Sequence, residues 1–229
     1  MSHLPPRRVF KNSLSQWIIS IAIYMAIFAF FMWYHEVRGK DYSLWTTEKC
    51  TAIAASITIA MALAMGPLSR ISQRVRAWLP YRRTLGLVGG YAVLVHVVLV
   101  LFYLNTLYPD TVTSTFDLAY FLEHWFLTLT GILSLIGYVI LMVTSYPKYS
   151  KKLGGKRWLK IQKGAYLLIA VVLVHLLSLG KVPNWFVYFD TFDKPFPPGS
   201  FAVTMICVAL LIPKIIDKLK PSDHAKSGN

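Results

Sequence analysis

Apolar residues in this chain gather into six long, nearly continuous runs separated by polar segments. Each run is close to the ~20 residues that an α-helix needs to cross the hydrocarbon core of a bilayer. The runs cover residues 17–34, 51–68, 84–104, 121–146, 160–180 and 200–216. The pattern therefore predicts an all-α membrane protein, folded as a bundle of six transmembrane helices.

Composition agrees with this interpretation, because 55% of the residues are hydrophobic and the mean hydropathy is +0.51. A soluble domain of this length is less apolar. We expect residues 1–229 to form a single membrane domain, with a core at 51–181 and polar tails at 1–16 and 217–229. The connections are too short for a soluble catalytic domain, and the chain has no Walker or dinucleotide glycine motif.

The formal net charge of +14 would suit a nucleic-acid-binding protein, but the distribution of the charges favours another explanation. With both termini in the cytoplasm, 19 of the 24 Lys and Arg residues lie inside and eight of the ten acids lie outside. This asymmetry follows the positive-inside rule. We therefore expect a multi-pass protein of the cell inner membrane, with the lipid bilayer and not nucleic acid as its partner.

Two histidines, His96 and His175, lie deep inside apolar runs. Ionisable side chains in a membrane span are expensive and usually mark a functional site. At 1.5 Å of rise per residue, they lie roughly 12 Å and 7 Å below the outer ends of their helices. Imidazole is a common axial ligand of haem iron, so the pair predicts one haem b held between two helices. The alternative is that each histidine hydrogen-bonds to a neighbouring helix.

His124 stands between Glu123 and Trp125 at the outer start of the fourth run. It is a candidate for contact with the haem periphery or a substrate, and the alternative is a solvated histidine at the membrane interface. Gly89 and Gly90 lie near the start of the third run, where small residues let another helix or a flat cofactor approach closely. We place these two glycines at the haem periphery as well.

Two stretches of the sequence resemble the ferric-reductase-like transmembrane domain family. The first carries GPLSR at 66–70, YRRTLGL at 81–87 and the helix of His96, and the second carries LGGKRW at 153–158 before the helix of His175. The likeness covers roughly residues 60–181. It is closest to the haem-bearing membrane subunit of bacterial periplasmic methionine sulfoxide reductase systems.

The resemblance implies that His96 and His175 ligate an outer haem. Members of the wider family hold a second, inner haem with histidines 13 or 14 residues before these ligands, whereas this chain has Gln162 and Arg82 there. The resemblance therefore implies a single haem. The chain also departs from the sulfoxide reductase subunit at KCTA, residues 49–52, where a His-x-Thr-Gly pattern is usual, and at Gln162, where a histidine is usual.

A single outer haem leaves the inner half of the membrane to be crossed by electrons. The resemblance suggests FMN, FAD or a quinone near the cytoplasmic face. The candidate residues for that cofactor are Arg82, Arg83, Gln162 and Lys163. A guanidinium fork suits a flavin phosphate, although the basic residues also serve to orient the chain.

These observations predict a membrane electron-transfer subunit without its own nucleotide-binding domain. We expect it to carry electrons from a cytoplasmic flavin reductase or quinol donor to a periplasmic redox partner. One alternative is a transporter or permease that uses the histidines, which would require more intramembrane acids than the apolar runs contain. The other is a non-catalytic membrane anchor subunit.

Overall fold

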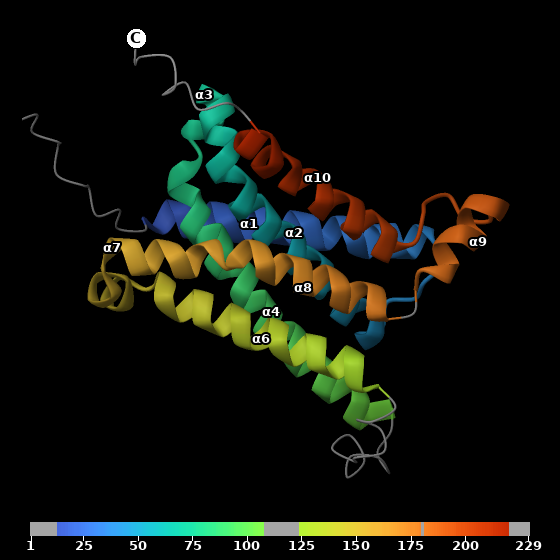
Figure 1. Ribbon diagram of the computed structural model, residues 1–229. Coiled ribbons are helices and arrows are strands. Elements are labelled where there is room, and N and C mark those ends of the chain that lie inside the picture. The colour runs from blue at the N-terminus through green and yellow to red at the C-terminus, as the bar shows by residue number, and fades with distance from the viewer. Residues whose placement is uncertain (1–12, 108–123, 180, 220–229) are drawn as a thin grey trace, which may run out of the picture.

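Helices account for nearly all of the residues described by the computed structural model, which are 13–107, 124–179 and 181–219, and no strand occurs among them (Figure 1). The elements are α1 (Leu14–Val37), α2 (Leu44–Ile71), α3 (Gln73–Arg76), η1 (Leu79–Tyr81), α4 (Arg82–Leu107), α6 (Trp125–Ser145), α7 (Pro147–Lys163), α8 (Ala165–Ser178), α9 (Pro183–Thr191) and α10 (Gly199–Leu219). Six stretches are long and apolar enough to cross a membrane: α1, α2, η1 with α4, α6, α7 with α8, and α10. The predicted six-helix membrane bundle is confirmed.

Some sequence-based expectations fall outside the described residues. They concern residues 1–12 and 220–229 of the two polar tails, and residues 108–123 between α4 and α6. The expected fifth run at 160–180 belongs to a longer unit, because α7 leads directly into α8 at Gly164. Within α7, Gly154 has φ +72°, which only glycine adopts easily, and the helix kinks there.

Helix α2 is the centre of the bundle. In its most apolar 18 residues, 72% of the positions are buried, against 17–39% in the other five spans. Helix α2 packs against α4 and α8, and α6 packs against the same two helices. These four helices therefore form a closed ring in which α4 and α8 lie on a diagonal. Facing helices of such a bundle are where cofactor sites are commonly built.

Small residues bring α2 and α4 close together. A Cβ atom on Gly89 of α4 would lie 3.2 Å from the backbone oxygen of Ala55 and 2.5 Å from Cγ1 of Ile59, both on α2. Hydroxyl groups inside α2 are satisfied locally, since Thr58 donates to the carbonyl of Ala54 at 2.7 Å. Close packing and internal hydrogen bonding are the two requirements of helices in lipid, where no water is available.

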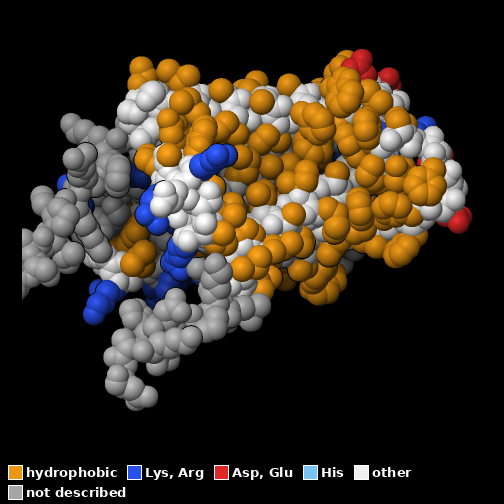
Figure 2. Space-filling model, turned by 90° about the horizontal axis from the view of Figure 1, so that it is seen from above, with side chains coloured by type: hydrophobic (Ala, Val, Ile, Leu, Met, Phe, Trp, Pro, Cys, Tyr) orange, Lys and Arg blue, Asp and Glu red, His pale blue; other side chains and the backbone are white. Residues whose placement is uncertain are grey.

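Charged residues separate along the bundle axis. In Figure 2 the visible Lys and Arg side chains gather mainly at one end, Asp and Glu lie at the other, and a broad apolar band covers the surface between them. The basic end carries α3 and α7, with Arg74 and Arg76 on α3 and Lys160 and Lys163 on α7. We refer to it as the inner end and to the opposite end as the outer end.

An aromatic cap closes part of the outer end. Helix α9 packs there against α10, with the ring of Phe189 5.0 Å from that of Phe201, centroid to centroid. The ring of Phe196, in the connection to α10, stacks on Tyr34 of α1 at 5.1 Å. The hydroxyl of Tyr34 donates to the carbonyl of Pro197. The connection between α8 and α10 is thereby held against α1.

Candidate functional site

His175 lies three residues before the end of α8 and faces the first turns of α6. Its Nδ1 is 3.1 Å from the carbonyl oxygen of Leu127 and 3.1 Å from Oγ1 of Thr130. The Thr130 hydroxyl donates its proton to carbonyls in its own helix, Phe126 at 2.8 Å or Leu127 at 2.9 Å. Both neighbours of Nδ1 therefore act as acceptors, so the proton sits on Nδ1 and the lone pair on Nε2.

Gly131 makes room for the imidazole ring of His175. A Cβ atom at this position would lie 3.1 Å from Cε1 of His175 and 3.5 Å from its Nδ1. Any side chain here would push the ring away from α6. The glycine thus allows the ring to lie against the helix backbone, where the carbonyl of Leu127 can bind it.

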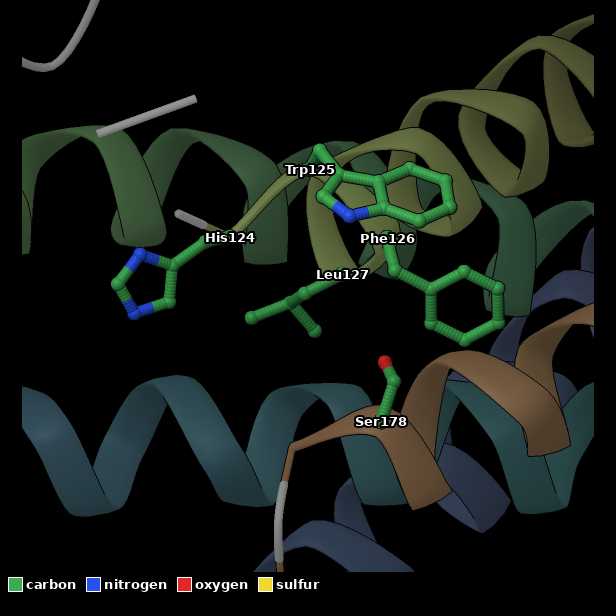
Figure 3. Close-up of a pocket in the computed structure, with 5 residues that line it drawn as sticks. All are labelled: His124, Trp125, Phe126, Leu127 and Ser178. Atoms are coloured by element: carbon green, nitrogen blue, oxygen red, sulfur yellow. The ribbon is translucent and has the colours of Figure 1, made fainter. Parts of the chain in front are cut away.

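A pocket of about 150 Å³ opens next to His175 at the outer end (Figure 3). It is lined by His124, Trp125, Phe126, Leu127 and Ser178. Two of these residues contact His175 directly, since Ser178 donates to its carbonyl at 2.7 Å and Leu127 binds its Nδ1. His124 therefore lies in one pocket with two contacts of His175, and its expected place at the haem periphery stays a prediction.

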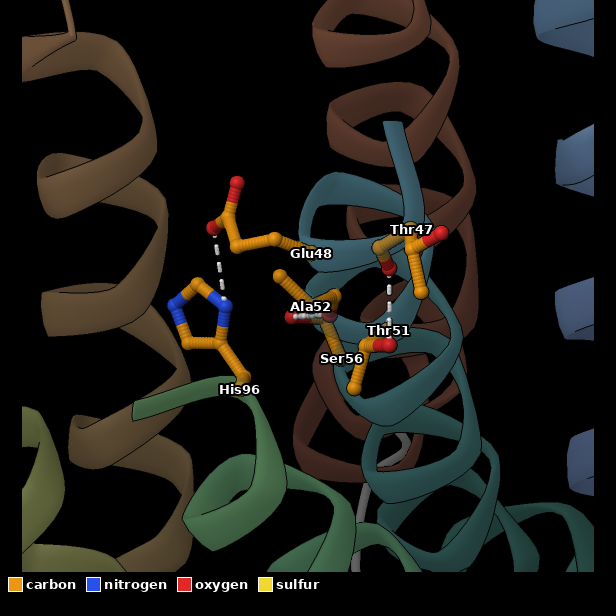
Figure 4. A network of polar contacts seen from close by, with 6 residues as sticks. All are labelled: Thr47, Glu48, Thr51, Ala52, Ser56 and His96. Atoms are coloured by element: carbon orange, nitrogen blue, oxygen red, sulfur yellow. Dashed lines mark hydrogen bonds and ion pairs between the residues drawn. The ribbon is translucent and has the colours of Figure 1, made fainter. Parts of the chain in front are cut away.

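His96 projects from α4 toward the N-terminal turns of α2 (Figure 4). Its Nδ1 lies 3.0 Å from Oε1 of Glu48, which is an ion-pair separation without the alignment of a hydrogen bond. The opposite ring nitrogen, Nε2, faces away from Glu48 toward α8. A carboxylate only accepts hydrogen bonds, so this neighbour also favours a proton on Nδ1 and a lone pair on Nε2.

His96 and His175 lie on the two helices of the diagonal, α4 and α8. His96 contacts the second turn of α2, and His175 contacts the first two turns of α6. Each imidazole meets a different helix through Nδ1, α2 for His96 and α6 for His175, so neither Nε2 atom takes part in that contact.

This donor set suits a metal that brings its own equatorial ligands. Among the residues that the structure describes, no group of three or more His, Cys, Asp or Glu side chains could hold a bare ion. Haem iron needs only two axial ligands from the protein, and neutral imidazole is a common one. His96 and His175 therefore fit a haem and do not fit a structural zinc or calcium site.

Glu48 is the site residue that the sequence did not reveal. The apolar run was expected to begin at 51, which would leave Glu48 in an outer loop, but α2 begins at Leu44. Ser43 caps the helix, since its Oγ accepts from the backbone N–H of Thr46 at 3.2 Å. Glu48 is thus on the helix, and its side chain is only 12% exposed. The Ser43-x-x-Thr46 start could have indicated the earlier boundary.

The basic residues expected to bind an inner cofactor have separate surroundings in the structure. The guanidinium of Arg82 lies over Gly66 of α2, with Nη1 3.0 Å from the position of a Cβ atom. The Nε of Arg83 is buried and has no hydrogen-bond partner among the described residues. Lys163 is exposed at the end of α7. No contact that the structure describes joins these three cations.

Gln162 closes the inner end of α6. Its Nε2 lies 3.1 Å from Oγ1 of Thr144, 3.3 Å from Oγ of Ser145 and 3.4 Å from the carbonyl oxygen of Leu141. The side chain therefore satisfies acceptors at the C-terminal turn of α6, where backbone carbonyls lack helical partners. This tie between α7 and α6 explains what Gln162 does in the fold; its contact with an inner cofactor stays a prediction.

Gly89 and Gly90 both face neighbouring helices. Gly89 meets Ile59 of α2, and a Cβ atom on Gly90 would lie 2.5 Å from Sδ of Met142 on α6. Gly137 of α6 meets Leu168 of α8 in the same way, at 2.7 Å. Close helix packing accounts for these glycines, and a place for Gly89 and Gly90 at the haem periphery stays a prediction.

Residues 50–174 match the model of a protein family described as "Ferric reductase like transmembrane component". The match covers more than half of the chain, from the second turn of α2 to the last turns of α8. It includes His96 and ends one residue before His175.

Proposed function

Because the chain belongs to the ferric reductase-like transmembrane family, a family of membrane electron-transfer components, we propose that it is a membrane haem b protein with His96 and His175 as the axial ligands. The observation that carries this proposal is the shared arrangement of the two rings. Nδ1 of His175 binds the Leu127 carbonyl of α6, and Nδ1 of His96 lies at the Glu48 carboxylate of α2 with Nε2 turned toward α8. When bound, haem iron supplies one-electron transfer, while the protein supplies ligation, orientation and burial.

The proposal includes one haem for each chain. Arg82 and Gln162 stand where an inner pair of ligands would be required, and Gln162 is engaged with Thr144 and Ser145. Further contacts fill the inner half of the bundle, where Gly90 packs on Met142 and Gly137 on Leu168. Close approach of α4 and α8 to α6 at these glycines supports a single haem near the outer end.

The charge distribution supports an orientation of the chain in the membrane. We propose that the basic end faces the cytoplasm, with both termini there, because the positive-inside rule places Lys and Arg on that side of the cell inner membrane. Electrons then travel from a cytoplasmic flavin reductase or quinol to an outer acceptor. The likeness to the membrane subunit of sulfoxide reductase systems favours a periplasmic reductase as that acceptor, reached near the pocket of His124 and Ser178.

The optical spectrum of the purified protein tests the proposed function. We expect a low-spin haem b spectrum that changes on reduction with dithionite, and a pyridine haemochrome assay that gives one haem per chain. A transporter or an anchor subunit would contain no haem. A value near two haems per chain would show that the inner half holds a second site.

A relay near the cytoplasmic face belongs to the same proposal. Arg82 precedes His96 by 14 residues, which is about 21 Å along a helix at 1.5 Å per residue. A flavin or quinone near Arg82 and Arg83 would divide this distance into shorter electron-transfer steps. The buried Nε of Arg83 supports the idea, because it is a donor without a hydrogen-bond partner in the described part of the chain.

Substitution of Arg82 by lysine tests this relay. The change keeps the positive charge but removes the planar fork that binds a phosphate or a quinone carbonyl. We expect normal insertion and haem content. Reduction of the haem by a water-soluble quinol or by reduced FMN should slow roughly tenfold, the scale seen when a hydrogen-bonding residue beside a redox site is changed. Stopped-flow absorbance measures the rate. Arg76→Lys, on an exposed residue of α3 at the same end, is the control; equal rates in both variants would leave Arg82 with a role in topology alone.

A further inference from the structure

The partly buried carboxylate of Glu48 has no role in the function proposed so far. It lies on the second turn of α2, inside a stretch able to cross the membrane, and its side chain is 12% exposed. A charge at such a position is costly unless it is paired. The adjacent cation, Lys49, places its ammonium 3.4 Å from the centre of the Trp45 ring. The ion-pair contact of Glu48 is with Nδ1 of His96 at 3.0 Å.

The environments of the two histidines differ in charge. Nδ1 of His175 faces two neutral oxygens, those of Leu127 and Thr130. Nδ1 of His96 faces a carboxylate. A carboxylate 3.0 Å from Nδ1 attracts the Nδ1 proton electrostatically and makes Nε2 a stronger donor to a metal, and such neighbours also hold the ring in orientation. The two imidazoles are therefore unequal as ligands.

We propose that Glu48 is the positioning residue of His96, which directs its Nε2 toward α8 and strengthens it as a ligand to haem iron. This inference rests on the proposed function of His96. A stronger axial donor stabilises ferric iron more than ferrous iron, because the ferric ion carries the larger positive charge. Glu48 thus lowers the reduction potential of the haem and favours onward transfer of its electron to the outer acceptor.

Potentiometric titration of the haem-loaded protein in lipid nanodiscs tests the proposal with Glu48→Gln. The amide keeps the size of the side chain and removes its charge. We expect the haem to stay bound and low-spin, while the equilibrium constant for reduction rises about tenfold, which is 59 mV for one electron. The electron paramagnetic resonance spectrum of the ferric form should shift as well, because the ligand field of His96 weakens.

Two further variants separate this role from a structural one. Glu36→Gln removes a carboxylate from the same end of the bundle, where Glu36 accepts from the Tyr42 hydroxyl; we expect the wild-type potential. Glu48→Asp keeps the carboxylate on a shorter side chain, and we expect a potential between those of the wild type and Glu48→Gln.

The outcomes decide between the two proposals. A wild-type protein without haem would overturn the proposed function itself. A haem-loaded wild type with an unchanged potential in Glu48→Gln would overturn only the role of Glu48. If Glu48→Gln loses the haem, Glu48→Asp decides: retention of the haem there supports a carboxylate that holds His96, and loss in both variants contradicts it.

Discussion

Replacement of either His96 or His175 by alanine is expected to abolish the low-spin haem spectrum and to lower the haem content by more than about tenfold. Loss of even a residue that only hydrogen-bonds a metal ligand costs about 10–100-fold in metal affinity. Each variant removes an imidazole that the proposal assigns to the iron, and no group of three or more His, Cys, Asp or Glu side chains among the described residues offers a replacement. Haemochrome quantification against protein mass and the absorption spectrum measure the effect.

His35→Ala is the matched control for these variants. His35 lies at the outer end of α1 and packs on Gly199 of α10, with Nε2 3.0 Å from the position of a Cβ atom there. It is a histidine at the same end of the bundle but on a different pair of helices. We expect its replacement to leave the spectrum intact. Full haem content in His175→Ala would remove the ligand assignment altogether.

Gly131→Val is expected to disrupt the site while leaving both histidines in place. Even the Cβ atom would lie 3.1 Å from Cε1 of His175, and the valine methyl groups add to this clash. Overpacking costs about 1–3 kcal/mol, which corresponds to a roughly 5- to 150-fold loss of haem affinity. The measurements are haem titration of the apoprotein and the low-spin fraction of the bound haem.

The control for this prediction is Gly137→Val in the same helix. Gly137 meets Leu168 of α8, with 2.7 Å from a Cβ position to Cδ1, so the substitution also strains the contact between α6 and α8. It lies six residues further from the outer end and does not touch His175. We expect Gly137→Val to lower thermal stability and to retain a low-spin spectrum. Similar spectral changes in both variants would show that helix separation, and not displacement of the ring, is responsible.

The number and approximate position of the helices could be predicted from the sequence, because a segment that crosses lipid must be long and apolar whatever its neighbours are. The separation of basic and acidic residues between the two ends of the bundle could be predicted in the same way, from the positions of Lys and Arg along the chain. His96 and His175 were conspicuous for a related reason, since an imidazole inside an apolar run stands out without any knowledge of its contacts. These properties are local to each segment.

What the tertiary structure alone decided is the set of partners around those histidines. Glu48 lies 48 residues before His96, and Leu127 lies 48 before His175; nothing in either local pattern pairs them. Gly131 is one of several glycines in apolar runs, and only the packing of α8 on α6 places it under a histidine ring. Such contacts depend on which faces of α2, α4, α6 and α8 meet. In lipid, close packing and polar pairing between helices decide which faces meet. The length and hydropathy of a single segment carry no information about these contacts.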